Sequence, residues 1–152
     1  MRQTTLEQEL RAGNNCVSTT VGTSMYPMLR NRRDTVIIEP VRHELRRYDL
    51  PLYKRPNGQY VLHRILRVKE DGYVICGDHC WQKEDPVPKE WILGVVTGFY
   101  RDNTYISVKN PLYQAYVHIW CDFFWMRSLI LRTRARVGGV KRRIRRKLGL
   151  SK

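Results

Sequence analysis

Two residues of this chain have the types and spacing of a catalytic nucleophile and its base. Ser24 lies in the run Gly22-Thr23-Ser24-Met25-Tyr26-Pro27-Met28-Leu29, and His63 follows thirty-nine residues later in the run Leu62-His63-Arg64-Ile65. A serine hydroxyl is a poor nucleophile until a neighbouring base takes its proton, and a neutral imidazole is the usual base. The glycine and the proline that flank Ser24 favour a tight turn that presents its hydroxyl. The pair therefore predicts nucleophilic catalysis.

A structural interpretation of the same residues is also open at this point. Ser-X-X-Pro is common in turns, and a histidine in an apolar strand often serves only as a hydrogen-bonded core residue. The spacing of Ser24 and His63 by itself does not separate the two interpretations, so the surrounding blocks of sequence must decide.

Five blocks of the chain carry a further signal in their order and spacing. They are Gly22 to Leu29, Arg33-Asp34-Thr35-Val36, Tyr48-Asp49-Leu50, Val61 to Ile65 and Cys76-Gly77-Asp78. Together they resemble the signal peptidase I superfamily of serine peptidases, which also contains the self-cleaving SOS repressors. The resemblance covers roughly residues 17 to 100, and His63-Arg64-Ile65 fits the histidine-base branch found in endoplasmic-reticulum and archaeal enzymes. It implies that Ser24 is the nucleophile and His63 the general base.

The same resemblance implies a carboxylate that orients the imidazole, in the block that begins Gly77-Asp78. The family pattern has two asparagines and then an acidic pair, whereas this chain has His79 and Cys80 and then Glu84-Asp85. We expect Asp85 to be the third member of the triad, with Asp78 and Glu84 as the alternatives. Asp78 can equally serve only to cap a turn.

The elements that must position these residues are mostly strands. Apolar and β-branched runs predict strands at Cys16 to Val21, Thr35 to Glu39, Leu50 to Lys54, Gln59 to Val68, Gly72 to Cys76, Ile92 to Tyr100 and Thr104 to Val108. Asn57-Gly58 and Asp71-Gly72 predict hairpin turns between neighbouring strands. The fold class is therefore mainly β, an antiparallel domain over residues 16–110 that agrees with the resembled family. A polar segment, residues 1–15, precedes it.

Residues 111–131 have a different pattern, with apolar side chains in helical register. The run predicts an amphipathic helix whose aromatic residues suit a membrane surface; these are Trp120, Phe123, Phe124 and Trp125. A membrane span is the less favourable alternative, because Asp122 and Arg127 together cost about 5 to 7 kcal/mol of insertion free energy. A helix packed on the sheet is the third interpretation.

The last segment, residues 132–152, is strongly basic. It holds ten of the 28 Lys and Arg residues and no acidic residue, so most of the net charge of +14 lies outside the β domain. The basic side chains include Arg132, Arg134, Arg136, Lys141, Arg142, Arg143, Arg145, Arg146 and Lys147. Such a tail favours an anionic membrane surface as a partner, and nucleic acid is the second interpretation.

Localisation and cofactors follow from what the sequence lacks. Residues 1–21 contain no apolar span and no secretory signal, so we expect a cytoplasmic protein, peripheral on the inner face of the membrane, with a single span as the alternative. The cysteines Cys16, Cys76, Cys80 and Cys121 are then expected as reduced thiols. Cys76, His79 and Cys80 suggest zinc only weakly, since a second ligand pair is missing, and no cofactor is predicted.

The predicted function is a serine endopeptidase that cleaves a protein precursor or leader peptide through Ser24 and His63. Met25, Tyr26 and Met28 are expected to line a groove for an extended peptide. The Ser24 backbone N–H and the Thr23 hydroxyl are expected to hold the oxyanion. Two alternatives are a regulator that cleaves itself at Ala12-Gly13, and a non-enzymatic module that binds membrane or nucleic acid.

Overall fold

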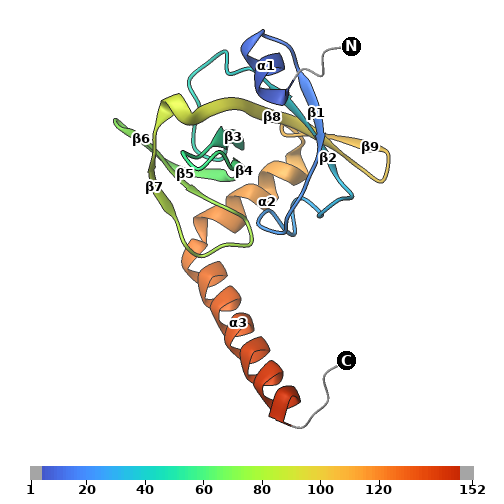
Figure 1. Ribbon diagram of the computed structural model, residues 1–152, viewed down its shortest axis with the longest axis vertical. Coiled ribbons are helices and arrows are strands. Elements are labelled where there is room, and N and C mark those ends of the chain that lie inside the picture. The colour runs from blue at the N-terminus through green and yellow to red at the C-terminus, as the bar shows by residue number, and fades with distance from the viewer. Residues whose placement is uncertain (1–4, 148–152) are drawn as a thin grey trace.

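The computed structural model describes residues 5–147, with side chains for residues 5–136. Within this range the chain forms two antiparallel sheets and three α-helices (Figure 1). The first sheet has the order β1 (Cys16–Thr19), β2 (Thr35–Glu39), β8 (Ile92–Arg101), β3 (Pro51–Lys54), β4 (Tyr60–Leu62), and β9 (Thr104–Ser107) also pairs with β8. The second sheet has the order β5 (Arg64–Lys69), β6 (Gly72–Cys76), β7 (Glu84–Val87). The predicted mainly β, antiparallel fold class is confirmed.

Both predicted hairpins form, with their turns at Asn57-Gly58 and Asp71-Gly72. The turn between β3 and β4 is closed by a hydrogen bond from Gly58 N–H to the Arg55 carbonyl oxygen (2.9 Å), and Gly58 has φ +83°. This positive φ is accessible to glycine at little steric cost. Asp71-Gly72 similarly connects β5 to β6. Local sequence therefore sets the two hairpins that bring the central strands together.

Two apolar cores hold the sheets, and β3 lies between them. Its neighbouring residues Leu52 and Tyr53 point to opposite faces, as strand geometry requires. Leu52 packs in the first core with Val36, Ile38 and Phe99, whereas Tyr53 packs in the second core. Both faces of β3 are therefore covered, so its side chains are held rigidly.

One predicted strand, Gln59 to Val68, is wrong as a single element. The chain forms β4 up to Leu62 and β5 from Arg64, and these strands belong to different sheets. His63 is the residue at the break, because β4 pairs with β3 and β5 turns away to pair with β6. The imidazole therefore lies where the two sheets meet, and not within either of them.

The N-terminal segment contains a short helix, α1 (Leu6–Arg11). It begins with a reciprocal capping box between Thr5 and Gln8, and its buried residue is Leu10. A second short element, the 3₁₀ helix η1 (Lys89–Trp91), leads into β8. Helix α1 closes one end of the first core.

The C-terminal region forms two helices, so the prediction of one helix over 111–131 followed by a separate tail is wrong. Helix α2 (Pro111–Asp122) begins at the Asn110 cap and buries Tyr113, Val117 and Cys121. This four-residue spacing puts one face of α2 on the first core, as the third interpretation expected. The chain then breaks at Phe123 and continues as α3 (Phe124–Lys147).

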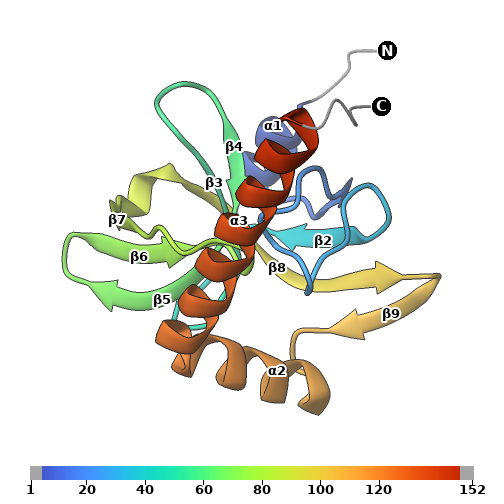
Figure 2. The same ribbon diagram turned by 90° about the horizontal axis from the view of Figure 1, so that it is seen from below.

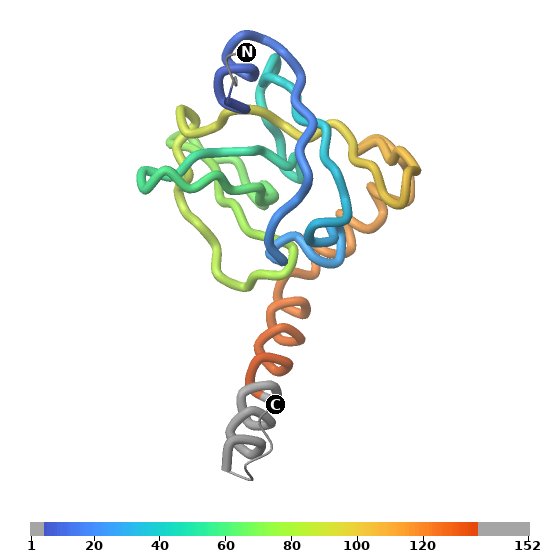
Figure 3. Tube along the Cα trace, turned by 45° about the vertical axis from the view of Figure 1, so that its right-hand side comes forward, coloured from blue at the N-terminus to red at the C-terminus, as the bar shows by residue number. Residues whose placement is uncertain are grey.

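Helix α3 extends beyond the β domain at the end opposite α1 (Figures 1 and 3). Seen from below in Figure 2, β2, β8 and β9 lie on one side of it and β5, β6 and β7 on the other. None of the helices between residues 5 and 147 combines the length and apolar character that crossing a bilayer requires. The side chains of the predicted basic tail beyond residue 136 lie outside the described residues.

Candidate active site

Ser24 lies in the turn that joins β1 to β2. Hydrogen bonds within the turn, from Tyr26 N–H to the Thr23 oxygen and from Leu29 N–H to the Met25 oxygen, fold it tightly (3.1 and 2.9 Å). Met25 and Leu29 are buried beneath it, so Ser24 is left half-buried at the surface. The apolar anchors therefore fix the turn from below and present the serine, as the sequence pattern predicted.

A buried carboxylate holds the far end of the same turn. Asp34 is 0 % exposed and accepts hydrogen bonds from the Arg30 backbone and guanidinium and from Arg101. Burial by itself would raise the pKa of Asp34, but the bonds from Arg30 and Arg101 outweigh it and lower that pKa. Asp34 thus stays ionised and ties the turn to β8.

His63 is buried and is held through its Nδ1 atom. Nδ1 lies 3.2 Å from Glu84 Oε1 and 3.3 Å from the Tyr53 hydroxyl oxygen. The Tyr53 hydroxyl donates its own hydrogen to Glu84 (2.6 Å). Because Glu84 only accepts, this arrangement favours the tautomer with hydrogen on Nδ1 and leaves Nε2 free to accept a proton.

The carboxylate that contacts His63 is Glu84, so the preference for Asp85 as the orienting acid is corrected. Asp85 is exposed and pairs with Lys69 on the surface (2.8 Å). Both residues lie in β7, where successive side chains point to opposite faces. Only one acid of the pair can therefore face the imidazole, and that acid is Glu84.

Asp78, the second candidate, does not contact His63 either. Its side chain is fully buried and forms a two-point ion pair with Arg64, with distances of 2.9 Å and 2.8 Å. The Tyr116 hydroxyl of α2 also donates to it. Asp78 therefore fixes the start of the loop after β6, which is more than the turn cap considered from sequence.

Glu84 is held ionised by its neighbours. Burial would raise the pKa of Glu84, but hydrogen bonds from His63, Arg55 and Tyr53 together lower it to about 2. Arg55 makes two of these contacts, Nη2 to Oε1 at 2.6 Å and Nε to Oε2 at 3.0 Å. The carboxylate can thus hold the imidazole and stabilise it as it becomes charged.

Gly77 brings the serine turn and the imidazole together. A Cβ atom at Gly77 would lie 2.6 Å from the Ser24 carbonyl oxygen and 2.9 Å from His63 Nε2. Both distances are shorter than real Cβ contacts, so only glycine fits between the two residues. Nε2, the nitrogen left free by the contacts on Nδ1, therefore faces the Ser24 turn.

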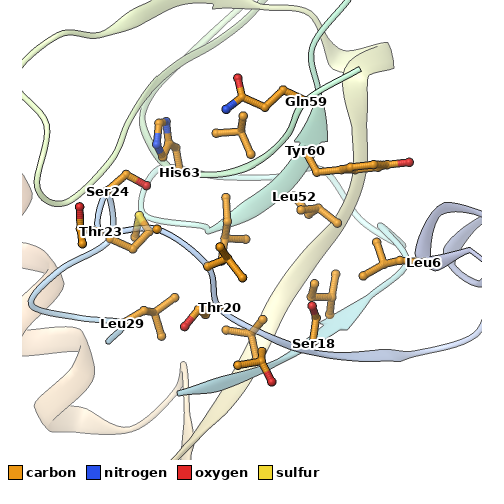
Figure 4. A pocket seen from close by; sticks show the side chains of 18 of the residues that line it. Leu6, Ser18, Thr20, Thr23, Ser24, Leu29, Leu52, Gln59, Tyr60 and His63 are labelled. Atoms are coloured by element: carbon orange, nitrogen blue, oxygen red, sulfur yellow. The ribbon is translucent and has the colours of Figure 1, made fainter. Parts of the chain in front are cut away.

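Ser24 and His63 lie at one end of a cavity of about 820 Å³ (Figure 4). Its floor is apolar and consists of Leu29, Val36, Ile38, Leu52 and Leu62. Its sides are β1 with the residues that follow it, and β4. Each of these strands is at an edge of the first sheet, so each has one side without a partner strand in that sheet. Of the three residues predicted to line a groove, Met25 lines this cavity from the first core, whereas Tyr26 and Met28 do not line it.

The expected oxyanion donors lie at this end of the cavity as well. Thr23 and Ser24 both line it, and Figure 4 shows their side chains beside His63. Within the described part of the chain, neither the Ser24 N–H nor the Thr23 hydroxyl donates a hydrogen bond to another residue. Both groups can therefore donate to a bound carbonyl oxygen.

The cysteines near the site have structural contacts. All four cysteines are free thiols. Cys76 donates to the carbonyl oxygens of Cys80 and Gln82, and burial raises the pKa of its thiol to about 12. His79 packs edge-on against Tyr26. Among residues whose side chains are described, no three His, Cys, Asp or Glu side chains form a group that could hold a metal ion.

Several residues of this site had no signal in the sequence. Tyr53 and Arg55 belong to a β-strand and its turn, outside any motif, and their role depends on contact with Glu84 across the two sheets. No family model and no solved structure matches the chain. The fold and the site define a mainly antiparallel β protein in which Ser24 and His63 lie at one end of an apolar cleft and Glu84 contacts the imidazole from behind.

Proposed function

We propose that this protein is a serine endopeptidase that cleaves a protein precursor or leader peptide, with Ser24 as nucleophile and His63 as general base. One observation carries the proposal. His63 is held through Nδ1 by an ionised Glu84, while its Nε2 faces the Ser24 turn at the end of an apolar cleft. Nucleophile, base and orienting carboxylate in this order are what acyl transfer requires.

In the proposed reaction, Ser24 Oγ attacks the carbonyl carbon of the scissile peptide bond as Nε2 takes the hydroxyl proton. The carbon–nitrogen bond then breaks as the imidazolium returns that proton to the leaving amine, which forms a neutral N-terminus. A water molecule attacks the resulting ester with His63 again as base, and this releases the acid and regenerates Ser24. Glu84 stays ionised throughout and stabilises the imidazolium.

The cleft also suits the backbone of an extended substrate. An unpaired strand edge offers N–H and C=O groups to a peptide that adds as a further strand. Both β1 and β4 offer such an edge beside the cavity. By the family resemblance, small side chains are expected before the cleaved bond.

The test uses a proteome-derived peptide library with the purified full-length protein. New termini are identified by mass spectrometry and compared with those produced by Ser24→Ala and His63→Ala. We expect a set of cleavages that both variants lose. Identical termini for all three proteins would overturn the proposal.

The self-cleaving alternative is not favoured by the fold. Ala12-Gly13 and Ser24 lie at opposite ends of β1, which is hydrogen-bonded to β2 from Cys16 to Thr19. The scissile bond would reach Ser24 of its own chain only after β1 had left the sheet. An exchange with a second molecule is tested by incubating Ser24→Ala protein with the unmodified protein.

A second candidate function, attachment to an anionic membrane surface from the cytoplasmic side, is favoured by the first turns of α3. Trp125 and Leu129 are 68 % and 57 % exposed, and Met126 and Ile130 are also exposed. Arg132, Arg134 and Arg136 follow them on the same helix, all exposed. Apolar side chains that can enter a headgroup region beside basic ones are typical of peripheral helices.

A further inference from the structure

Arg127 of α3 is buried, and no acidic side chain between residues 5 and 136 forms an ion pair with it. It is 2 % exposed, and its Nε and Nη1 atoms have no hydrogen-bond partner among the residues with described side chains. Its remaining nitrogen, Nη2, lies 3.3 Å from the Gly77 carbonyl oxygen and 3.2 Å from that of Cys80. A buried charge with few partners carries a desolvation cost. Stability therefore does not explain a buried arginine at this position.

The loop that Arg127 holds forms one wall of the proposed active site. His79 donates its backbone N–H to the Ser24 carbonyl oxygen at 2.7 Å. Gly77 separates Ser24 from His63 Nε2 with no room for a Cβ atom. Arg127 thus binds the carbonyl oxygens on both sides of His79, the residue whose N–H holds the Ser24 turn.

Aromatic residues of the C-terminal helices hold the same loop and the same guanidinium. Trp120 donates Nε1–H to the Asp78 carbonyl oxygen at 2.8 Å. The Arg127 guanidinium lies over the Phe124 ring at 4.6 Å and near the Trp120 ring at 5.9 Å. Side chains of α2 and α3 therefore bind the carbonyl oxygens of Gly77, Asp78 and Cys80.

We infer that Arg127 is a positioning residue for the Ser24/His63 site, and that α2 and α3 serve as the support that holds residues 77–80 against it. The inference rests on the proposed endopeptidase function. Arg127 touches neither the serine nor the imidazole, and acts by fixing the loop that sets the distance between them. The C-terminal helices are then part of the catalytic unit as well as a candidate membrane attachment.

The test compares Arg127→Met with Arg134→Met in the full-length protein. Methionine keeps an unbranched apolar chain in the buried site but cannot bind carbonyl oxygens, and Arg134 is an exposed residue of the same helix. A misplacement of reacting groups by about 1 Å can cost about 100-fold in rate. We therefore expect Arg127→Met to lower kcat about 10- to 100-fold on the library peptide that the unmodified protein cleaves fastest. KM should change less than about 3-fold, because β1, β4 and the cleft floor are unaltered.

Two further readouts separate positioning from a merely structural role. The thermal midpoint of Arg127→Met should be unchanged or higher, since replacing a poorly paired buried charge by an apolar side chain is often neutral or stabilising. Amide hydrogen exchange at His79 and Cys80 should become faster while exchange in β2 and β8 stays the same. Arg134→Met should match the unmodified protein in every measurement.

Each outcome decides the inference. Unchanged kcat in folded Arg127→Met overturns it, and so does a fall in kcat that only follows a fall in the thermal midpoint. If Arg127→Met does not fold, Trp120→Phe, which loses the bond to the Asp78 oxygen, is judged by the same criteria. If Ser24→Ala leaves library cleavage unchanged, the proposed function itself fails, whereas the exchange of the His79 amide still reports whether Arg127 holds the loop.

Discussion

The sharpest prediction concerns Glu84 and its neighbour Asp85, which are adjacent in β7 and face opposite sides of it. Glu84→Gln keeps the size of the side chain and one acceptor oxygen but removes the negative charge beside His63. Asp85→Asn makes the same chemical change one residue away, where the carboxylate pairs with Lys69 on the surface. The two variants therefore form a matched pair that isolates the charge next to the imidazole.

The size of the effect follows from the contact distances. At an effective dielectric constant of about 20, a positive charge on Nδ1 lying 3.2 Å from Oε1 is attracted by about 5 kcal/mol. Arg55 binds both oxygens of the same carboxylate and cancels part of that attraction. A net loss of about 2 to 3 kcal/mol remains, which corresponds to about a 30- to 150-fold decrease in kcat.

The assay measures kcat and KM at 25 °C on the most rapidly cleaved library peptide. Glu84→Gln should lower kcat by the stated factor with little change in KM, because Glu84 does not line the cleft. Asp85→Asn should stay within about 2-fold of the unmodified protein, as expected for an exposed ion pair. An equal or larger loss in Asp85→Asn, or full activity in Glu84→Gln, would refute the assignment of the orienting carboxylate.

Three other predictions use different parts of the structure. Gly77→Ala should lower kcat at least 10-fold at an unchanged KM, because its Cβ would clash with the Ser24 carbonyl oxygen. An unchanged kcat would show that the loop can move to accommodate the Cβ atom. The lowered pKa of Glu84 makes a contribution to the free energy of unfolding that is complete above pH 4.5 and is lost as pH falls toward about 2. Denaturant unfolding across that range should therefore show an acid-induced loss larger by about 2 kcal/mol in the unmodified protein than in Glu84→Gln, and equal losses would contradict the pKa. In flotation assays, vesicles with anionic lipid should bind the protein at low salt and release it at high salt, and neutral vesicles should bind it weakly. The double variant Trp125→Ser, Leu129→Ser should bind anionic vesicles more weakly than the unmodified protein. Equal binding of the two proteins would show that this face of α3 does not contact the membrane.

Much of the fold follows from local pattern. Alternating apolar residues and the Asn57-Gly58 and Asp71-Gly72 turns predict most strands and both hairpins within a few residues, since these signals act over short stretches of chain. The strand β7 was not predicted, because Glu84 to Val87 is polar and contains a proline. The break at His63 was also not predicted, because β4 and β5 join different sheets and no residue pattern near His63 indicates the end of a strand.

The sequence by itself points to Ser24 and His63 as the candidate nucleophile and base, because a serine in a glycine- and proline-flanked turn and a histidine in an apolar run are local features. Tertiary structure decides which acid serves the imidazole, since that depends on the face of β7 that turns toward Tyr53 and Arg55 across the two sheets. It likewise decides the contacts of Arg127 with the Gly77 and Cys80 oxygens, which no local pattern in the sequence predicts. Contacts between residues far apart in the chain determine both, and no short-range pattern encodes them.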